Sequence, residues 1–139
     1  MKRLAKLLLG VLVLLAIILV AFRIAAAFRE TTPLGALPPQ GGSLIETQEG
    51  AIYTLAHGDP QATPVLFAHG TAAWSGLWEP TLEVIGQGPY RTIGYDLPPF
   101  GYSQHDNAGD YSRARQADRI LALVTAMDIR PIVVAHSFG

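Results

Sequence analysis

The chain contains no cysteine, so neither a disulfide framework nor a cysteine-based metal site can form in its 139 residues. Charged side chains are scarce as well, at 15% of the sequence, and half of the ten basic ones stand in the first thirty positions. The remaining residues carry five basic against ten acidic side chains, a net charge of −5. Because no basic patch is left to neutralise phosphates, we expect no nucleic acid partner.

A long apolar run stands near the N-terminus instead. Every residue from 7 to 22 is apolar or glycine, and a helix continued to residue 28 is about 33 Å long, enough for a hydrocarbon core of about 30 Å. Three basic residues precede the run: Lys2, Arg3 and Lys6. The positive-inside rule therefore predicts a single-pass membrane protein with a cytoplasmic N-terminus and an exported remainder, although Arg23 and Arg29 weaken this charge bias. On this prediction, residues 7–28 bind the lipid bilayer by spanning it.

A cleaved signal peptide is the alternative interpretation, because residues 25–27 offer an Ala-x-Ala cleavage site. The anchor is favoured, since the apolar core is at or beyond the usual signal-peptide length and Arg23 lies within the approach to the cut. Either way the rest is exported. We assign residues 1–30 to the anchor or signal, residues 31–43, with three prolines and three glycines, to a linker, and residues 44–139 to a folded domain.

Short apolar runs alternate with helical patterns along the predicted domain. Residues 44–47 and 51–56 predict a hairpin of two strands, and residues 80–85 predict a short helix. Three further strand-like runs end near Ala68, Asp96 and Val134. Strands that alternate with helices need crossover connections, so the pattern predicts an α/β fold with a mostly parallel sheet.

The longest predicted helix of the folded domain covers residues 111–127. Its apolar residues recur at steps of three and four: Ala114, Ala117, Leu121, Val124 and Met127. Polar residues fall between them: Arg113, Gln116 and Arg119. We expect the first set to pack against the sheet and the second to face water.

Three motifs follow the last three strand-like runs. The first is His69-Gly70, which leads into a loop at residues 72–78 with two tryptophans. The second, residues 96–103, reads Asp-Leu-Pro-Pro-Phe-Gly-Tyr-Ser and is too rich in proline and glycine for a helix or a central strand. The third, residues 135–139, reads Ala-His-Ser-Phe-Gly. Such a small-x-Ser-x-Gly segment makes a sharp turn that lifts a serine hydroxyl clear of a sheet.

In order and spacing, these motifs resemble those of the α/β-hydrolase family, over about residues 44 to 139. In that family a His-Gly follows the third strand, an Asp-x-Pro-Gly-x-Gly-x-Ser loop the fourth, and the nucleophile elbow the fifth. Two positions depart from this pattern: Pro99 stands where many relatives have glycine, and Ala135 begins the elbow where glycine is commoner. The resemblance implies the N-terminal portion of an α/β-hydrolase, with flanking helices, truncated at the elbow.

The resemblance also implies a role for each motif. Ser137 would be the nucleophile that forms an acyl-serine intermediate. The oxyanion hole would use backbone N–H groups, from Phe138 and Thr71 with Ala72 as the next candidate. The loop would be supported by His69, in a structural role rather than as a base, and by Gly70. The remaining elbow residues would be Ala135, His136 and Gly139, and an acyl pocket would be lined by Trp74 and Trp78.

The family places the acid and the histidine of its triad after the nucleophile, whereas all four histidines here precede Ser137. We therefore expect the N-terminal fragment of a membrane-anchored serine hydrolase that acts on a small-molecule acyl substrate without a metal or cofactor. Carboxylesterases, lipases, aminopeptidases, carbon–carbon hydrolases and haloperoxidases share these motifs, while an aspartate nucleophile would have indicated epoxide hydrolases or haloalkane dehalogenases. The alternative is a truncated, non-catalytic, membrane-tethered interaction module.

Residues 1–139 expressed alone are predicted to show no measurable esterase turnover. The triad acid and histidine are missing from this sequence, and a C-terminal carboxylate two residues from Ser137 would oppose an oxyanion. The measurement is hydrolysis of an activated ester by the purified chain. Saturable hydrolysis that disappears in Ser137→Ala would refute the prediction.

Overall fold

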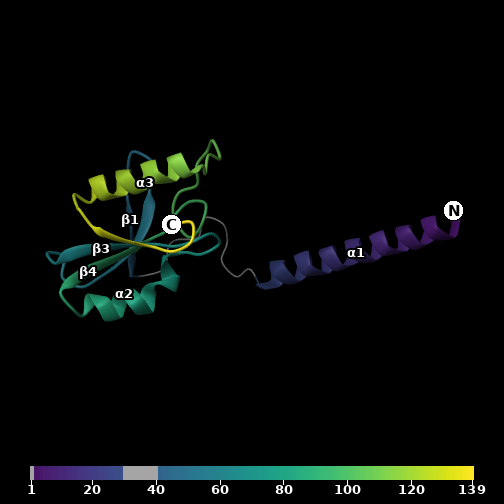
Figure 1. Cartoon of the computed structure of the whole chain (residues 1–139), viewed down its shortest axis with the longest axis horizontal. Helices are drawn as coiled ribbons and strands as arrows, with labels where there is room; N and C mark the ends of the chain where they lie inside the picture. Colours follow the sequence, from purple (N-terminus) through teal and green to yellow (C-terminus); the bar gives the residue numbers. More distant parts are fainter. Residues whose placement is uncertain (1, 30–40) are drawn as a thin grey trace. The chain divides into compact units, whose positions relative to one another are not determined.

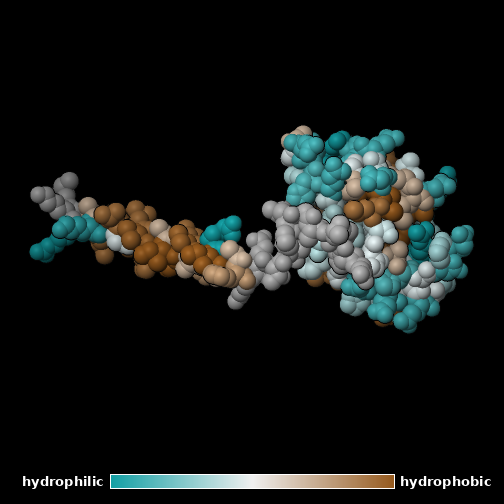
Figure 2. All heavy atoms as spheres, turned by 180° about the vertical axis from the view of Figure 1, so that it is seen from behind, coloured by the Kyte–Doolittle hydropathy of each residue, from teal (hydrophilic) through white to brown (hydrophobic). Residues whose placement is uncertain are grey.

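The computed structural model describes residues 2–29 and 41–139, which belong to two separate units. The first unit contains helix α1 (Lys2–Arg29). Figure 2 shows hydrophobic residues along most of this helix. Residues Arg3–Phe28 are long and apolar enough to cross a membrane, and a signal sequence near the N-terminus would meet the same criteria. Most of the predicted linker, residues 31–40, lies outside the described residues.

The second unit is built on a five-stranded sheet with strand order β1-β2-β4-β3-β5. Its strands are β1 (Gly42–Ile45), β2 (Ile52–His57), β3 (Thr63–Ala68), β4 (Tyr90–Tyr95) and β5 (Ile132–Ala135). The β1–β2 pair forms the predicted antiparallel hairpin, and β2 is also antiparallel to β4. Strand β3 is parallel to both β4 and β5. The predicted α/β class is confirmed.

Helical crossovers join the three parallel strands. Helix α2 (Glu79–Gly86), preceded by a 3₁₀ turn (Ser75–Leu77), connects β3 to β4, and α3 (Arg113–Ala126) connects β4 to β5. The two helices cover opposite faces of the sheet (Figure 1). Because the strands are parallel, the carboxyl ends of β3, β4 and β5 lie at one edge of the sheet, and the three sequence motifs begin there.

Alternating residues of the strands fill two cores, one under each helix. In β3, Leu66 packs in the cluster with Leu123 of α3, while the next residue, Phe67, packs in the cluster with Leu82 of α2. This alternation follows from the two-residue period of a strand. Strand β3, which lies between β4 and β5, is thus packed on both of its faces, and the first of the three motifs follows it directly.

The predicted inner face of α3 was wrong in part. Gln116 and Arg119 are only 4% and 2% exposed, whereas Leu121 is 64% exposed. Ala114 and Ala117 are exposed as well. The buried face of α3 consists of Gln116, Arg119 and Leu123, flanked by Ile120, Val124 and Met127. Hydrophobic periodicity misplaced the face because the two polar side chains find hydrogen-bond partners in distant loops, which permits their burial.

The corrected face of α3 gives a stability prediction. Leu123→Ala should lower the free energy of unfolding by about 2–5 kcal/mol, because Leu123 is fully buried and its truncation leaves a cavity. The matched change Leu121→Ala, two residues away on the same helix, should alter it by less than about 0.5 kcal/mol. Urea unfolding of the full chain in detergent measures both. Equal losses would contradict the observed face.

Candidate active site

The elbow turns immediately after β5. The His136 N–H donates to the Ala68 carbonyl at 3.1 Å, which ties the elbow to the end of β3. Ser137 then adopts a φ of 60°, a left-handed conformation that costs a non-glycine residue roughly 1–2 kcal/mol. A strained backbone of this kind persists only where the surrounding structure fixes it, and it is common at functional sites.

Two glycines make room for the turn. A Cβ on Gly70 would lie 2.8 Å from the Ser137 Cβ, so only glycine lets this loop pass so close to the serine. A Cβ on Gly139 would lie 2.8 Å from both the Ala68 Cβ and the Ala68 carbonyl oxygen. The small residues at these positions therefore allow close contact between the elbow and the His69-Gly70 motif.

His69 is buried and uses both ring nitrogens. The Leu97 N–H donates to its Nε2 at 2.8 Å, so Nε2 has to be an acceptor. The proton is then on Nδ1, which lies 2.8 Å from the Gly70 carbonyl and donates to it. Because both nitrogens are engaged, His69 is the neutral Nδ1–H tautomer and has no free nitrogen with which to accept the serine proton.

The loop after His69 carries free backbone donors. The Gly70 carbonyl also accepts from the Ala73 N–H at 3.3 Å, which closes a turn in which Ala72 has a φ of 59°. Within residues 41–139, the N–H groups of Thr71, Ala72 and Phe138 donate to no protein acceptor. These are the three groups named from the sequence as oxyanion donors, and they stand on the two segments that meet at Gly70.

The second motif folds around the carboxylate of Asp96. This fully buried side chain accepts from the Ser75 N–H and the Tyr102 N–H, each at 2.7 Å. The Ser103 hydroxyl donates to the Asp96 carbonyl at 2.6 Å and accepts from the Tyr53 N–H at 2.8 Å. Asp96 is therefore a structural hydrogen-bond acceptor that organises the loop beside His69.

Two buried tyrosines stay neutral near this loop. Burial raises the pKa of Tyr95, and burial together with the negative charge of Asp96 raises the pKa of Tyr53. The Tyr95 hydroxyl has no hydrogen-bond partner in the part of the chain that the structure describes. With raised pKa values, neither phenol can serve as a base at neutral pH.

The other three histidines make no hydrogen bond to Ser137 in the described part of the chain. His57 ends β2, which runs antiparallel, and it pairs with Thr92 well before the carboxyl end of β4. His105 is exposed on a loop, and His136 is exposed within the elbow itself. No hydrogen bond joins any of the four histidines to Ser137 among the described residues.

The two tryptophans differ in their surroundings. The Trp78 ring packs on Phe67, with ring centroids 5.3 Å apart, in the core under α2. Trp74 is exposed for almost half of its surface. Trp78 is therefore a packing residue, whereas Trp74 has exposed surface that a ligand can reach.

Sequence reasoning missed a buried polar cluster on α3. The Gln116 side-chain amide donates to the Pro98 carbonyl, and its oxygen accepts from Arg119 at 2.9 Å. Arg119 also donates to the Asp106 carboxylate at 2.6 Å and to the Asp110 carbonyl at 2.9 Å. The signal that the sequence offered for this cluster was the three-residue spacing of Gln116 and Arg119. The sequence did not indicate which loop residues they contact.

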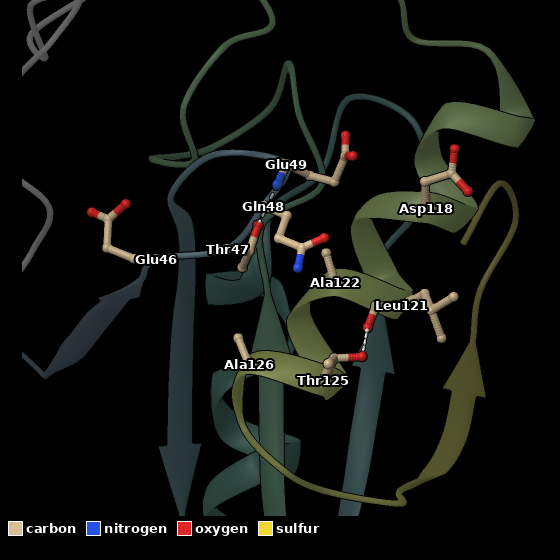
Figure 3. A pocket seen from close by; sticks show the side chains of 9 residues that line it. All are labelled: Glu46, Thr47, Gln48, Glu49, Asp118, Leu121, Ala122, Thr125 and Ala126. Atoms are coloured by element: carbon tan, nitrogen blue, oxygen red, sulfur yellow. Dashed lines mark hydrogen bonds between the residues drawn. The ribbon is translucent and has the colours of Figure 1, made fainter.

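A surface hollow of about 620 Å³ lies elsewhere on this unit. It is bounded by the segment after β1 and by α3, as Figure 3 shows. The lining residues are Glu46, Thr47, Gln48, Glu49, Asp118, Leu121, Ala122, Thr125 and Ala126. None of them belongs to the three motifs, so the hollow is separate from the candidate active site. Among the described residues, no group of three or more potential metal ligands is found.

Comparison with known proteins identifies the family. A family model described as the alpha/beta hydrolase fold matches residues 63–139. The chain belongs to this family. It is 28% identical to a haloalkane dehalogenase from Psychrobacter cryohalolentis over 90 residues, which are 64% of this chain and 30% of that protein. The resemblance inferred from the three motifs is confirmed.

Solved structures agree on the α/β-hydrolase fold. An epoxide hydrolase from Vigna radiata has a TM-score of 0.65 at 21% identity, covering 70% of this chain and 32% of that one. A thioesterase domain from the curacin biosynthetic pathway has a TM-score of 0.64 at 22% identity, covering 70% and 37%. The chain spans about a third of the length of these relatives.

A pair of glycine substitutions tests the Asp96 loop. Gly101 and Gly109 have similar φ angles, 64° and 68°, but a Cβ on Gly101 would overlap the Asp96 carboxylate, while one on Gly109 would meet nothing within 4 Å. Gly109→Ala should cost roughly 1–2 kcal/mol of stability for its backbone alone. Gly101→Ala should cost about 1–3 kcal/mol more because of the overlap. Urea unfolding of the two variants gives this difference, and equal losses would contradict the packing of Asp96 against Gly101.

Proposed function

We propose that Ser137 is the nucleophile of a serine hydrolase that cleaves carboxylic ester or related acyl bonds through an acyl-serine intermediate. The observation that carries the proposal is the left-handed Ser137, held against Gly70 and close to backbone N–H groups that have no protein partner within residues 41–139. A tetrahedral oxyanion needs such donors, and each is typically worth about 3–4 kcal/mol in the transition state.

The type of nucleophile favours acyl chemistry over the reactions named for two of the relatives. If a serine oxygen displaced a halide or opened an epoxide, the product would be an ether, which water does not readily cleave. If a serine attacks an acyl carbonyl, the product is an ester, which water can hydrolyse to regenerate the enzyme. Ser137 therefore supports acyl transfer rather than dehalogenation or epoxide hydrolysis. One of the structural relatives is named a thioesterase domain, and thioester cleavage is an acyl-transfer reaction.

The general base and its acid are proposed to lie in a part of the protein outside these 139 residues. None of the four histidines here hydrogen-bonds to Ser137 in the described structure, and His69 has no free nitrogen. The chain spans about a third of its relatives' length, which leaves room for the missing groups in the whole protein. On this proposal the 139 residues alone are inactive.

We further propose that α1 anchors the protein in a bilayer, with the hydrolase part exported. The support is the apolar composition of Arg3–Phe28 and the basic residues before it. Arg23 stands near the C-terminal end of the apolar stretch, and a long basic side chain near a helix end can reach the headgroup region.

The proposed function predicts that native membranes contain a serine-reactive form of this protein. A fluorophosphonate probe should label a band that an antibody against residues 111–127 recognises, well above the 14.9 kDa of these residues. Replacing Ser137 with alanine should abolish that label, because the attacking oxygen is lost.

The same blot can also refute the proposed function. An unlabelled band at or below 14.9 kDa would refute the hydrolase and favour a membrane-tethered interaction module. That alternative would use the edge of β5, where Ile132 and Val133 are both exposed.

A further inference from the structure

Gln116 is held at both ends of its side-chain amide. Its nitrogen donates to the Pro98 carbonyl, and its oxygen accepts from the Arg119 guanidinium at 2.9 Å. Because a guanidinium can only donate, the orientation of the amide is fixed by its partners. The side chain is buried, so no water competes for either bond. Gln116 of α3 therefore binds the second motif, at the Pro98 carbonyl.

The Pro98 peptide lies next to the residue that holds His69. The Leu97 N–H donates to the His69 Nε2 at 2.8 Å, and the His69 Nδ1–H donates to the Gly70 carbonyl, also at 2.8 Å. Gly70 in turn packs against Ser137 so closely that it has no room for a Cβ. A continuous series of contacts thus runs from α3 to the loop that carries the N–H groups of Thr71 and Ala72, the two proposed oxyanion donors of that loop.

The α3 end of this series is itself rigid. Arg119 is buried, donates to the Asp106 carboxylate at 2.6 Å and to the Asp110 carbonyl at 2.9 Å, and lies over the Tyr111 ring at 5.4 Å. With its charge paired to Asp106 and hydrogen bonds to two further groups, the Arg119 guanidinium is held in one position, from which it donates to the Gln116 oxygen.

We propose that Gln116, fixed by Arg119, is a positioning residue that sets the placement of the 70–72 oxyanion loop through Pro98, Leu97 and His69. The inference rests on the proposed function, because it assigns the loop a catalytic use. A donor displaced by about 1 Å can cost on the order of 10²-fold in rate without any contact between the displaced residue and the substrate. Gln116 acts in this way through the loop and does not touch the reacting atoms.

Gln116→Glu is the test. It is made in the whole protein of native membranes, which on the proposed function includes the base and the acid outside these 139 residues, and that protein is solubilised in detergent with α1 present. The side chain keeps its shape and its acceptor for Arg119, but it loses the donor to Pro98 and brings a carboxylate oxygen against that carbonyl. The rate constant of Ser137-dependent fluorophosphonate labelling should fall by about 10-fold or more. The control is Gln104→Glu, because Gln104 is exposed and its side chain bonds through the oxygen, which accepts from the Ala51 N–H at 3.1 Å. It should label within about twofold of the unmodified protein.

Hydrogen exchange supplies a readout that does not depend on activity. In Gln116→Glu, the Ala73 and Leu97 amides, which donate to the Gly70 carbonyl and to the His69 Nε2, should exchange at least about 10-fold faster, while those of α2 should keep their protection. If Gln116→Glu does not fold, Gln116→Asn keeps the amide one methylene short of Pro98 and should give the same pattern. Unchanged labelling or unchanged exchange at Ala73 and Leu97 would overturn the proposal. If the unmodified whole protein shows no Ser137-dependent labelling, the proposed function fails, and exchange alone then decides whether Gln116 holds the loop.

Discussion

The buried imidazole of His69 is the contact on which the arrangement of the site depends. It accepts from Leu97 after β4 and donates to Gly70 after β3, so it joins the carboxyl ends of two neighbouring parallel strands. Gly70 then determines how near the third motif, with Ser137, can approach. A neutral side chain that donates from one nitrogen and accepts at the other is required here, and histidine is the one side chain that offers both on opposite sides of a single rigid ring.

The sequence predicted what depends on local pattern and on motif order. The hairpin, the two helices and the three carboxyl-end motifs were expected at nearly the positions where they stand. Gly101 and Gly139 occupy close approaches that only glycine tolerates, which is why motif spacing carries so much structural information. The parallel direction of β3, β4 and β5 then followed from the alternation of strands and helices, because crossover connections leave few other topologies.

What the sequence left hidden depends on contacts between distant segments. The inner face of α3 is half polar because Gln116 and Arg119 reach Pro98 and Asp106, and no hydrophobic pattern encodes that pairing. The same holds for the tautomer of His69, which is set by a backbone N–H 28 residues away in sequence. Polar burial of this kind is decided by whether remote partners satisfy each group, so it becomes visible only with the fold.

The left-handed backbone of Ser137 connects stability with chemistry. A turn that costs roughly 1–2 kcal/mol has to be held by the surrounding structure, and here one side is held through His136 and Ala68 and the other side is bounded by Gly70. The first of these contacts comes from the end of β3 and the second from the loop that follows it, and β3 is packed on both faces. The rigidity of the core is therefore transmitted to the serine mainly through β3, while β5, with one exposed edge, contributes the residue itself. A site built in this way keeps Ser137 in place only as long as the two core layers on either side of β3 stay intact.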